Sequence, residues 1–308
     1  MSSSKDNFKM WKNRFVALWK FIPMILVYRF RLFLNRMKFS SKSPNSGISL
    51  LLPTYNRSGF LKCAMETIIL NTTSPYEIVV VDNASTDDTD KVITDLIRKY
   101  PDAPIVHMKM TYNYGTNGYA LAFLKSKYDF VVDMDDDILA VQKGWEKNVF
   151  QAFKDFDKLG FLALDVVQDK YTDGAKPDPS HYIKEKKGAT TIQIGPTGGW
   201  FSVTSRNIYY KAGGFIYLPN KPFRIEDADF SRKVKKRGLI CAILSNTYAY
   251  HGCGPIWNAK GKYHKEWKDK YKVDFGEETV NMVDSVTGVE LPEFDVPEKA
   301  MKALSAKV

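Results

Sequence analysis

The sequence predicts an α/β fold in which helices flank a mostly parallel central sheet. Three observations favour it. Largely apolar runs without alternation, typical of strands covered on both faces, occur at Ile48–Leu52, Glu77–Val81 and Phe130–Val132. Amphipathic helical patterns follow the first two runs, and polar residues stand at the carboxyl end of each run. Because the carboxyl ends of parallel strands meet at one edge of a sheet, we expect a ligand site there.

The first half of this fold has the order strand–helix–strand–helix–strand. One helix is expected to start near Ser58. The spacing of Ser85 and Asp88 is that of a capping box with Asp in place of Glu, and it predicts a second helix that ends near Tyr100. A weaker strand follows at Ile105–Met110. This order is typical of a parallel sheet with right-handed crossovers.

The second half continues the alternation less regularly. Trp145–Phe156 reads as a helix, and Phe161–Val167 and Leu239–Leu244 read as strands. The polar segment Gln168–Lys187 predicts a mobile loop over the site. A further helix opens with acidic residues after Phe223.

Composition narrows the class of protein. The chain has 308 residues, of which 44% are hydrophobic, so it can bury a sizeable core. A mean hydropathy of −0.31 is unlike that of a polytopic membrane protein. Its three cysteines form no disulfide framework and lack metal-ligand spacing, which favours a reducing compartment. We therefore expect a cytoplasmic protein.

The net charge of +10 is concentrated at the amino-terminal end of the sequence. Residues 1–46 contain ten Lys or Arg and one acidic residue, whereas the rest holds 35 basic and 34 acidic residues. A nearly neutral body lacks the basic surface expected of a nucleic-acid-binding protein. We expect no nucleic acid partner.

Residues 1–46 interleave aromatic and aliphatic residues with these cations. The longest uncharged run is Phe21–Tyr28, eight residues interrupted by Pro23, too short to span a bilayer. No small-residue cleavage site follows, which argues against a secretory signal peptide. The pattern favours an in-plane helix on an anionic membrane, on the inner face. The alternative is packing against the body or a second subunit, as in a homo-oligomer. Ser40–Gly47 is the expected linker.

The segment Tyr128–Ala140 carries the strongest chemical signal. A buried strand is expected to end in a cluster of four carboxylates within five residues, at Asp133, Asp135, Asp136 and Asp137. Adjacent carboxylates repel one another and cannot be buried without a positive partner. A divalent metal that carries a phosphate would provide one. The alternative is a solvated acidic turn.

Four segments together resemble a known family. LLPTYNR, EIVVVDNASTDDT, NYGTNGYA and YDFVVDMDDDI occur in the order and spacing of the nucleotide-binding half of a family-2 glycosyltransferase with the GT-A fold. The resemblance spans about residues 48–255. It implies a Rossmann-like catalytic domain over 47–255, with a nucleotide-binding half at 47–140 and an acceptor half at 141–255. The remaining segments are then an amino-terminal basic amphipathic helical extension, 1–46, and a carboxyl-terminal helical extension, 256–308.

The resemblance implies roles for the residues after each strand. Pro53, Thr54 and Tyr55 would line the nucleobase pocket, with Arg57 near the diphosphate. Asp82 would accept a hydrogen bond from the base or ribose, the alternative being a cap for the following helix. Backbone amides near Asn113, Gly115 and Asn117 would approach a sugar or phosphate, the alternative being an ordinary turn.

In the acidic cluster, the resemblance places the Asp-x-Asp motif on Asp135, Asp136 and Asp137. Asp135 and Asp137 would make the metal and ribose contacts, with Asp136 between them, and His251 would join the metal or diphosphate. The cofactor would be Mn²⁺ or Mg²⁺. Asp133 departs from the family pattern, in which this position is apolar, so the register of the motif stays open by two residues.

On the acceptor side, the resemblance implies that Gly198, Gly199 and Trp200 contact the acceptor. Trp200 would stack on a sugar face, the alternative being a buried Trp at a glycine bend. Asp227 would be the base that deprotonates the acceptor hydroxyl, with Glu226 as the alternate. Asp229 would be structural.

The function that follows is a metal-dependent inverting glycosyltransferase at the membrane surface. It would pass a sugar from a nucleotide-diphosphate sugar, a UDP-sugar by default, to a hydroxyl of a glycan or lipid-linked glycan. One alternative is a sugar nucleotidyltransferase, although the first strand is followed by no glycine- and arginine-rich phosphate loop. The other is a non-catalytic, membrane-associated scaffold.

Overall fold

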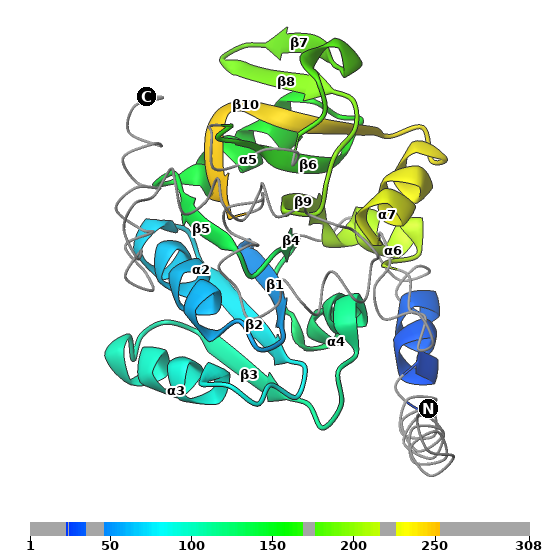
Figure 1. The fold of residues 1–308 in the computed structure, drawn as a ribbon. Helices are drawn as coiled ribbons and strands as arrows, with labels where there is room; N and C mark the ends of the chain where they lie inside the picture. The colour runs from blue at the N-terminus through cyan, green and yellow to red at the C-terminus, as the bar shows by residue number, and fades with distance from the viewer. Residues whose placement is uncertain (1–22, 24, 35–45, 169–175, 216–225, 253–308) are drawn as a thin grey trace, which may run out of the picture.

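The computed structural model describes residues 23, 25–34, 46–168, 176–215 and 226–252 (Figure 1). The predicted carboxyl-terminal extension, most of the linker and all of residues 1–22 lie outside these ranges.

The described residues form one ten-stranded sheet (Figure 1). Its strand order is β3-β2-β1-β4-β9-β6-β10-β8-β7, and β5 pairs with β10 beside this path. The bounds are β1 Ile48–Thr54, β2 Tyr76–Asp82, β3 Ile105–Lys109, β4 Phe130–Met134, β5 Ile138–Val141, β6 Leu159–Val166, β7 Ile183–Lys187, β8 Thr190–Ile194, β9 Phe201–Ser205 and β10 Ile240–His251.

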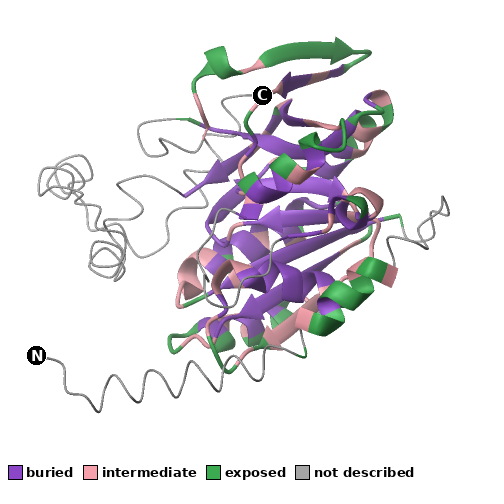
Figure 2. Cartoon of the chain, turned by 90° about the vertical axis from the view of Figure 1, so that its right-hand side faces the viewer, coloured by how far each residue is buried: buried purple, intermediate pink, exposed green. Residues whose placement is uncertain are grey.

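Helices cover both faces of this sheet. Two of the three hydrophobic clusters, each on its own face, combine strand residues with α2, α3 and α5 on one side and with α4, α6, α7 and the helical residues 25–34 on the other. Figure 2 shows the buried strands between these layers. The helix bounds are α2 Ser58–Asn71, α3 Thr89–Lys99, α4 Gly118–Lys125, α5 Trp145–Asp155, α6 Arg206–Ala212 and α7 Glu226–Lys235, with short 3-10 turns at Gly115–Asn117 and Pro179–His181.

The predicted α/β fold with a central sheet between helices is confirmed. The four strands β3, β2, β1 and β4 are parallel to one another. Beyond β4 the sheet is mixed, because β9 runs antiparallel to both β4 and β6. The predicted division at residue 140 falls inside β5, and the β4–β9 pairing makes the two halves one continuous sheet.

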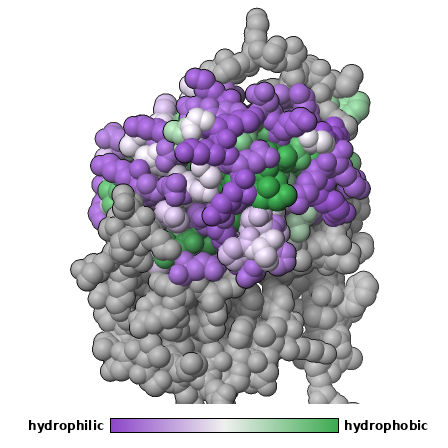
Figure 3. All heavy atoms as spheres, turned by 90° about the horizontal axis from the view of Figure 1, so that it is seen from above, coloured by the Kyte–Doolittle hydropathy of each residue, from purple (hydrophilic) through white to green (hydrophobic). Residues whose placement is uncertain are grey.

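Two local predictions are wrong. α3 begins at Thr89 rather than at a Ser85 capping box, because the Ser85 hydroxyl instead accepts a hydrogen bond from the Asn56 backbone at 2.9 Å. In the predicted loop Gln168–Lys187, residues Ile183–Lys187 form strand β7, paired with β8. β7 is exposed along its whole length and carries three lysines, which protect a sheet edge from pairing with another chain. Figure 3 shows that this end of the molecule is mostly hydrophilic.

Residues 25–34 form a helix that packs on the body. Tyr28 is 2% exposed, and its hydroxyl lies 2.7 Å from the Tyr209 hydroxyl and donates to the Phe215 carbonyl at 3.1 Å. This part of residues 1–46 is therefore in contact with the body through Tyr28. Among the described helices, none combines the length and apolar content needed to cross a membrane.

Candidate active site

The site forms where β1, β2 and β4 end. The registers of β1 with β2 and β4 bring Thr54 beside Asp82 and place the acidic turn after β4 at the same edge. Polar side chains gather here because each strand ends at this edge. The structure thus brings together the segments that the sequence predicted to meet.

Arg57 holds the acidic turn through two ion pairs. Its Nη1 donates to Asp136 Oδ1 at 2.6 Å and its Nη2 to Asp137 Oδ2 at 2.8 Å. Asp136 also accepts from the Thr54 hydroxyl at 2.7 Å. Although burial opposes it, these two carboxylates raise the pKa of the Arg57 guanidinium above its usual range. Arg57 therefore supplies the positive partner that the sequence required, although one cation faces several carboxylates.

Asp135, Asp137 and His251 form a group that could hold a metal ion. One ligand atom from each lies within 4.8 Å of the others. His251 Nε2 is 2.9 Å from Asp137 Oδ1 and 3.5 Å from Asp135 Oδ2. The end of β10 reaches the turn because β5, which follows the turn directly, pairs antiparallel with it. These are the three residues that the sequence predicted as metal ligands.

The carboxyls of this group have divergent pKa values. Burial, with the neighbouring Asp137 charge, raises the pKa of Asp135 to about 7. Burial also acts on Asp137, but Arg57 and His251 outweigh it and hold its pKa well below the usual range. Neighbouring carboxyls whose charges remain partly uncompensated favour the binding of a cation, as a metal site requires.

Asp133 points to another part of the site. It lies in β4, is 1% exposed, and neither carboxyl oxygen has a hydrogen-bond partner among the described residues. Burial and the charges of Glu226, Asp135 and Asp227 raise its pKa well above the usual range. Asp133 does not belong to the Asp–Asp–His group, so the geometry favours the Asp135–Asp137 register of the motif.

Asp227 lies in the first turn of α7 with both oxygens fixed. Oδ2 accepts from the Gly199 backbone at 2.9 Å and Oδ1 from the Ala228 backbone at 2.6 Å. Burial raises the pKa of this carboxyl, and the two N–H groups counteract the rise. Burial raises the pKa of Glu226 to about 8, which disfavours the charged form that a base needs, so Glu226 is the poorer candidate. Asp229 pairs with Arg232 and Lys233 and is structural, as predicted.

The segment Gly198–Trp200 connects the candidate base to the acidic turn. The Gly199 N–H binds Asp227, and the Trp200 carbonyl accepts from the Asp135 backbone at 3.0 Å. A Cβ on Gly199 would lie 3.1 Å from the Asp227 Cβ and 3.2 Å from Asp133 Oδ2, so the close approach favours glycine.

The prediction that Trp200 stacks on a sugar is wrong. Trp200 is 4% exposed, packs in the core and donates from its indole N–H to the Leu164 carbonyl at 2.9 Å. Its ring offers no open face, and the buried alternative is correct. A Cβ on Gly198 would lie only 2.2 Å from this ring, so Gly198 serves the packing of Trp200.

The remaining nucleotide-site candidates surround the same edge. Asp82 Oδ1 accepts from the Ser85 backbone at 2.8 Å, while Oδ2 is buried without a hydrogen-bond partner among the described residues. Asp82 thus orders the loop before α3 without capping this helix, whose N-cap is Asp88, and its Oδ2 lies 4.0 Å from His107 Nε2. Pro53 is half-buried, whereas Tyr55 is 37% exposed and can meet a base.

The NYGTNG segment makes a tight turn before α4. Asn113 accepts from the Gly115 backbone at 2.8 Å, and Gly115 has a φ of 56°, a conformation that favours glycine. Asn117 donates to the Tyr114 carbonyl. These side chains shape the turn, as expected for the alternative of an ordinary turn.

Two further residues near the site carry no recognisable signal in the sequence. The Tyr119 hydroxyl donates to Asp135 Oδ1 at 2.9 Å and so orients a candidate metal ligand. Gly118 starts α4 against Pro53, where a Cβ would lie 2.6 Å from the proline ring. Both belong to the NYGTNGYA segment, but their partners come from distant segments, Asp135 from the turn after β4 and Pro53 from β1, and no local pattern indicates such contacts.

Comparison with known proteins agrees with this geometry. Residues 49–216, more than half of the chain, match the family model described as Glycosyl transferase family 2. The chain belongs to this family. Membership of glycosyl transferase family 2 supports an enzyme of glycosyl transfer over the sugar nucleotidyltransferase and the non-catalytic scaffold.

The chain is similar in sequence to several named glycosyltransferases. It is 30% identical to chondroitin synthase of Pasteurella multocida over 70% of this chain and 26% of that protein. It is 32% identical to the UDP-Glc:alpha-D-GlcNAc-diphosphoundecaprenol beta-1,3-glucosyltransferase WfaP of Escherichia coli over 29% of this chain and 35% of that protein. The chain spans about a quarter to a half of the curated relatives it matches.

A solved structure shares the fold. The mannosyltransferase PcManGT from Pyrobaculum calidifontis, in complex with GDP-Man and Mn²⁺, superposes with a TM-score of 0.53 over 96% of this chain and 84% of that chain, at 14% identity. The expected GT-A fold is confirmed.

Proposed function

We propose that this chain is a metal-dependent, inverting glycosyltransferase. It takes a nucleotide-diphosphate sugar, a UDP-sugar by default, and transfers the sugar to a hydroxyl of a glycan or lipid-linked glycan. One observation carries the proposal: Gly199 and Trp200, adjacent in sequence, hydrogen-bond the candidate base Asp227 and the metal-ligand backbone of Asp135. The adjacent residues Gly199 and Trp200 therefore fix the candidate base and the candidate metal ligands relative to each other.

The residues present fit a divalent metal. Asp135 and Asp137 offer carboxylate oxygens, which suit both Mg²⁺ and Mn²⁺, and His251 offers a nitrogen, which favours Mn²⁺. The presence of Mn²⁺ in the PcManGT complex supports this choice. When bound, the ion would neutralise the negative charge of the departing nucleoside diphosphate.

The chain's own side chains would perform the proton transfer. Asp227, aimed by the Gly199 and Ala228 N–H groups, accepts the proton of the acceptor hydroxyl. The acceptor oxygen forms a bond to the anomeric carbon as the bond from that carbon to the diphosphate breaks on the opposite face. The configuration at that carbon is inverted, and Arg57 adds positive charge beside the leaving group.

Two relatives support the classes of donor and acceptor. PcManGT binds GDP-Man, whereas WfaP is named for UDP-Glc and a diphosphoundecaprenol-linked acceptor. A lipid-linked acceptor agrees with the basic, apolar residues 1–46, which we propose bring the enzyme to the inner, cytoplasmic face of a membrane.

A donor-hydrolysis screen tests this proposal. The full chain is incubated with UDP-, GDP- and dTDP-sugars, each with Mn²⁺, with Mg²⁺ or with a chelator. We expect one donor class to be hydrolysed, fastest with Mn²⁺, and the chelator to abolish release of the nucleoside diphosphate. Turnover that is undiminished by the chelator would reject the metal role, and binding without turnover of any donor would reject catalysis.

A further inference from the structure

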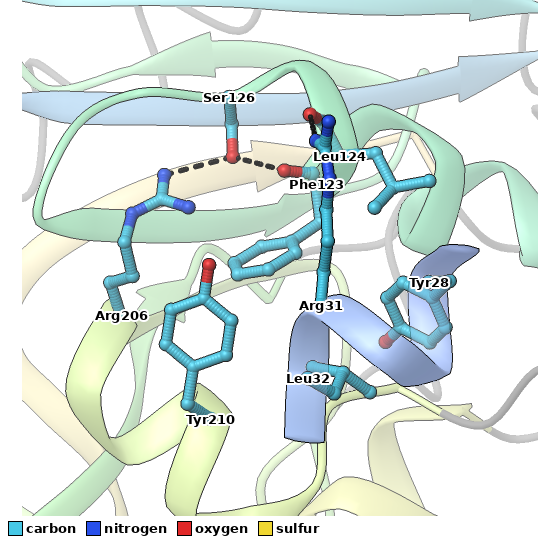
Figure 4. Close-up of a pocket in the computed structure, with 8 residues that line it drawn as sticks. All are labelled: Tyr28, Arg31, Leu32, Phe123, Leu124, Ser126, Arg206 and Tyr210. Atoms are coloured by element: carbon cyan, nitrogen blue, oxygen red, sulfur yellow. Dashed lines mark hydrogen bonds between the residues drawn. The ribbon is translucent and has the colours of Figure 1, made fainter. Parts of the chain in front are cut away.

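A pocket of about 200 Å³ lies between helix 25–34 and the body (Figure 4). It is lined by residues at the carboxyl-terminal end of α4, such as Leu124 and Ser126, and by α6. The opposite end of α4 starts at Gly118, against Pro53 at the candidate active site. One helix therefore connects the pocket to the site, but the two do not overlap.

Arg206 places a buried charge at this pocket. It is 7% exposed, and no carboxylate of the described residues lies within 4.0 Å of its guanidinium. Its Nε donates to the Tyr128 carbonyl at 2.7 Å and its Nη2 to the Ser126 hydroxyl at 2.9 Å. Among the described residues, Nη1 has no hydrogen-bond partner. A buried cation without a counter-charge is costly, so an anion would be favoured here.

Arg31 brings a second guanidinium from the other wall. Its Nη1 donates to the Leu124 carbonyl at 3.0 Å, and its other N–H groups make no hydrogen bond to the described residues. Figure 4 shows Arg31 and Arg206 on opposite sides, with the Tyr210 and Ser126 hydroxyls between them. Two planar guanidiniums with hydroxyls nearby suit the oxygens of a phosphate group.

The helix that carries Arg31 also exposes an apolar face. Leu26 and Phe30 are each 61% exposed and Phe33 is 64% exposed. Their spacing places them on one side of the helix, away from the docked Tyr28. Arg29 and Arg31 flank this side in the helical projection. Exposed aromatic and aliphatic side chains between arginines are typical of a helix that lies in a membrane interface.

We infer that this pocket binds the phosphate group of an anionic lipid, while the exposed face of helix 25–34 inserts beside it. Residues 1–46 contain ten Lys or Arg and one acidic residue, and this positive charge would attract the helix to an anionic membrane over a longer range. This inference rests on the membrane part of the proposed function and is independent of the transfer reaction. It assigns a lipid contact to Arg206 of the body, whereas the proposed function places membrane binding in residues 1–46 alone.

Vesicle binding by matched arginine variants tests it. The full chain is sedimented with phosphatidylcholine vesicles and with vesicles that also contain phosphatidylglycerol, without donor or metal. Arg29→Gln removes the same charge from the same helix but does not line the pocket. We expect it to weaken binding to the anionic vesicles about fivefold through lost diffuse attraction. Arg31→Gln should weaken binding about tenfold more, because it also loses hydrogen bonds to the phosphate.

Two further variants keep the test independent of folding. Arg206→Lys retains charge but loses the planar fork, and Tyr210→Phe retains the ring that packs edge-on against Phe123. We expect both to bind anionic vesicles less tightly, with melting temperature and donor hydrolysis as controls. The proposal that the pocket binds a lipid phosphate would be overturned if Arg29→Gln and Arg31→Gln lost vesicle affinity equally and Arg206→Lys and Tyr210→Phe lost none.

A soluble anion is the alternative source of the same chemistry. Inorganic phosphate, titrated at constant ionic strength, should raise the melting temperature of the wild type less than anionic vesicles do. If phosphate stabilises the wild type but not Arg31→Gln, and vesicles do not bind, the lipid assignment is overturned in favour of a soluble phosphate. Donor hydrolysis in solution is measured separately, so failure here leaves the glycosyltransferase proposal intact.

Discussion

Two neighbouring acids at the start of α7 differ in their suitability as a base. Asp227 receives two backbone N–H groups, which favour its charged form, whereas Glu226 is buried with one oxygen that has no hydrogen-bond partner among the described residues. The sequence motif contains both residues and does not distinguish them. Their surroundings do.

We expect Asp227→Asn to reduce sugar transfer by about 10²- to 10⁴-fold, because an amide accepts no proton but can keep the Gly199 contact. The matched control is Asp229→Asn, two residues along the same helix, whose partners are Arg232 and Lys233. The measurement is the initial rate of transfer, with donor binding followed by calorimetry. Near-normal transfer by a folded Asp227→Asn would reject this base.

Glu226 should make stability depend on pH in the metal-free protein. Burial raises its pKa to about 8, so between its ordinary pKa and pH 8 the folded state holds a proton that the unfolded state has lost. Stability from this group therefore falls as pH rises through that window and levels off above it.

Glu226→Gln resembles the protonated side chain and should remove this dependence. We expect the variant to gain free energy of unfolding relative to the wild type between about pH 5 and about pH 8.5. Urea unfolding of both metal-free proteins at these two pH values measures the difference. Parallel pH profiles would show that Glu226 is not buried as a neutral acid.

At the scale of elements, strand pairing assembles the metal group. β5 begins immediately after the acidic turn and pairs with the end of β10, which places His251 opposite Ile138. More than a hundred residues separate these partners in the chain. The Gly252 backbone N–H also donates a hydrogen bond to the Asp137 carbonyl at 2.7 Å, which fixes the end of β10 against the acidic turn.

Helix 25–34 depends on Tyr28 for its docking. We expect Tyr28→Ala to expose this helix to hydrogen exchange and to lower the free energy of unfolding by about 3 kcal/mol, since it empties a core position and removes two hydrogen bonds. Phe33→Ala, at a position 64% exposed, is the control and should leave protection unchanged. Hydrogen exchange followed by mass spectrometry resolves the two variants. Equal protection in both would mean that Tyr28 does not hold the helix.

At the scale of the whole molecule, the carboxylates after β4 and at the start of α7 face one another across the edge of a single sheet. Their mutual repulsion is offset in part by Arg57. A bound divalent cation should therefore stabilise the entire fold.

We expect Mn²⁺ at about 100 times its dissociation constant to add about 2.7 kcal/mol to the free energy of unfolding. The shift in melting temperature should disappear with a chelator and in Asp137→Asn. Asp90→Asn, an exposed acid paired with Lys109, should retain the shift and serves as the control. A wild-type melting temperature that neither Mn²⁺ nor Mg²⁺ changes would contradict the metal group.

The α/β fold, the parallel strands β1 to β4 and the residues that gather at their ends follow from patterns in the sequence alone. Strand runs, the polar residues after them and the order of the four motifs are local features, so they can be recognised before folding. The metal set of Asp135, Asp137 and His251 was predicted through the family resemblance and stays a prediction, now with a geometry that allows it.

Three features became visible only in the folded molecule: the burial of Trp200, the strand β7 and the contact of Asp82 with the loop that follows it. The fold also places the Asp133 carboxyl beside Gly199, where a Cβ would lie 3.2 Å from its Oδ2. Each of these depends on a partner from a distant segment. Burial, pairing and desolvation are properties of the packed chain, and no sequence pattern records which distant atoms will meet.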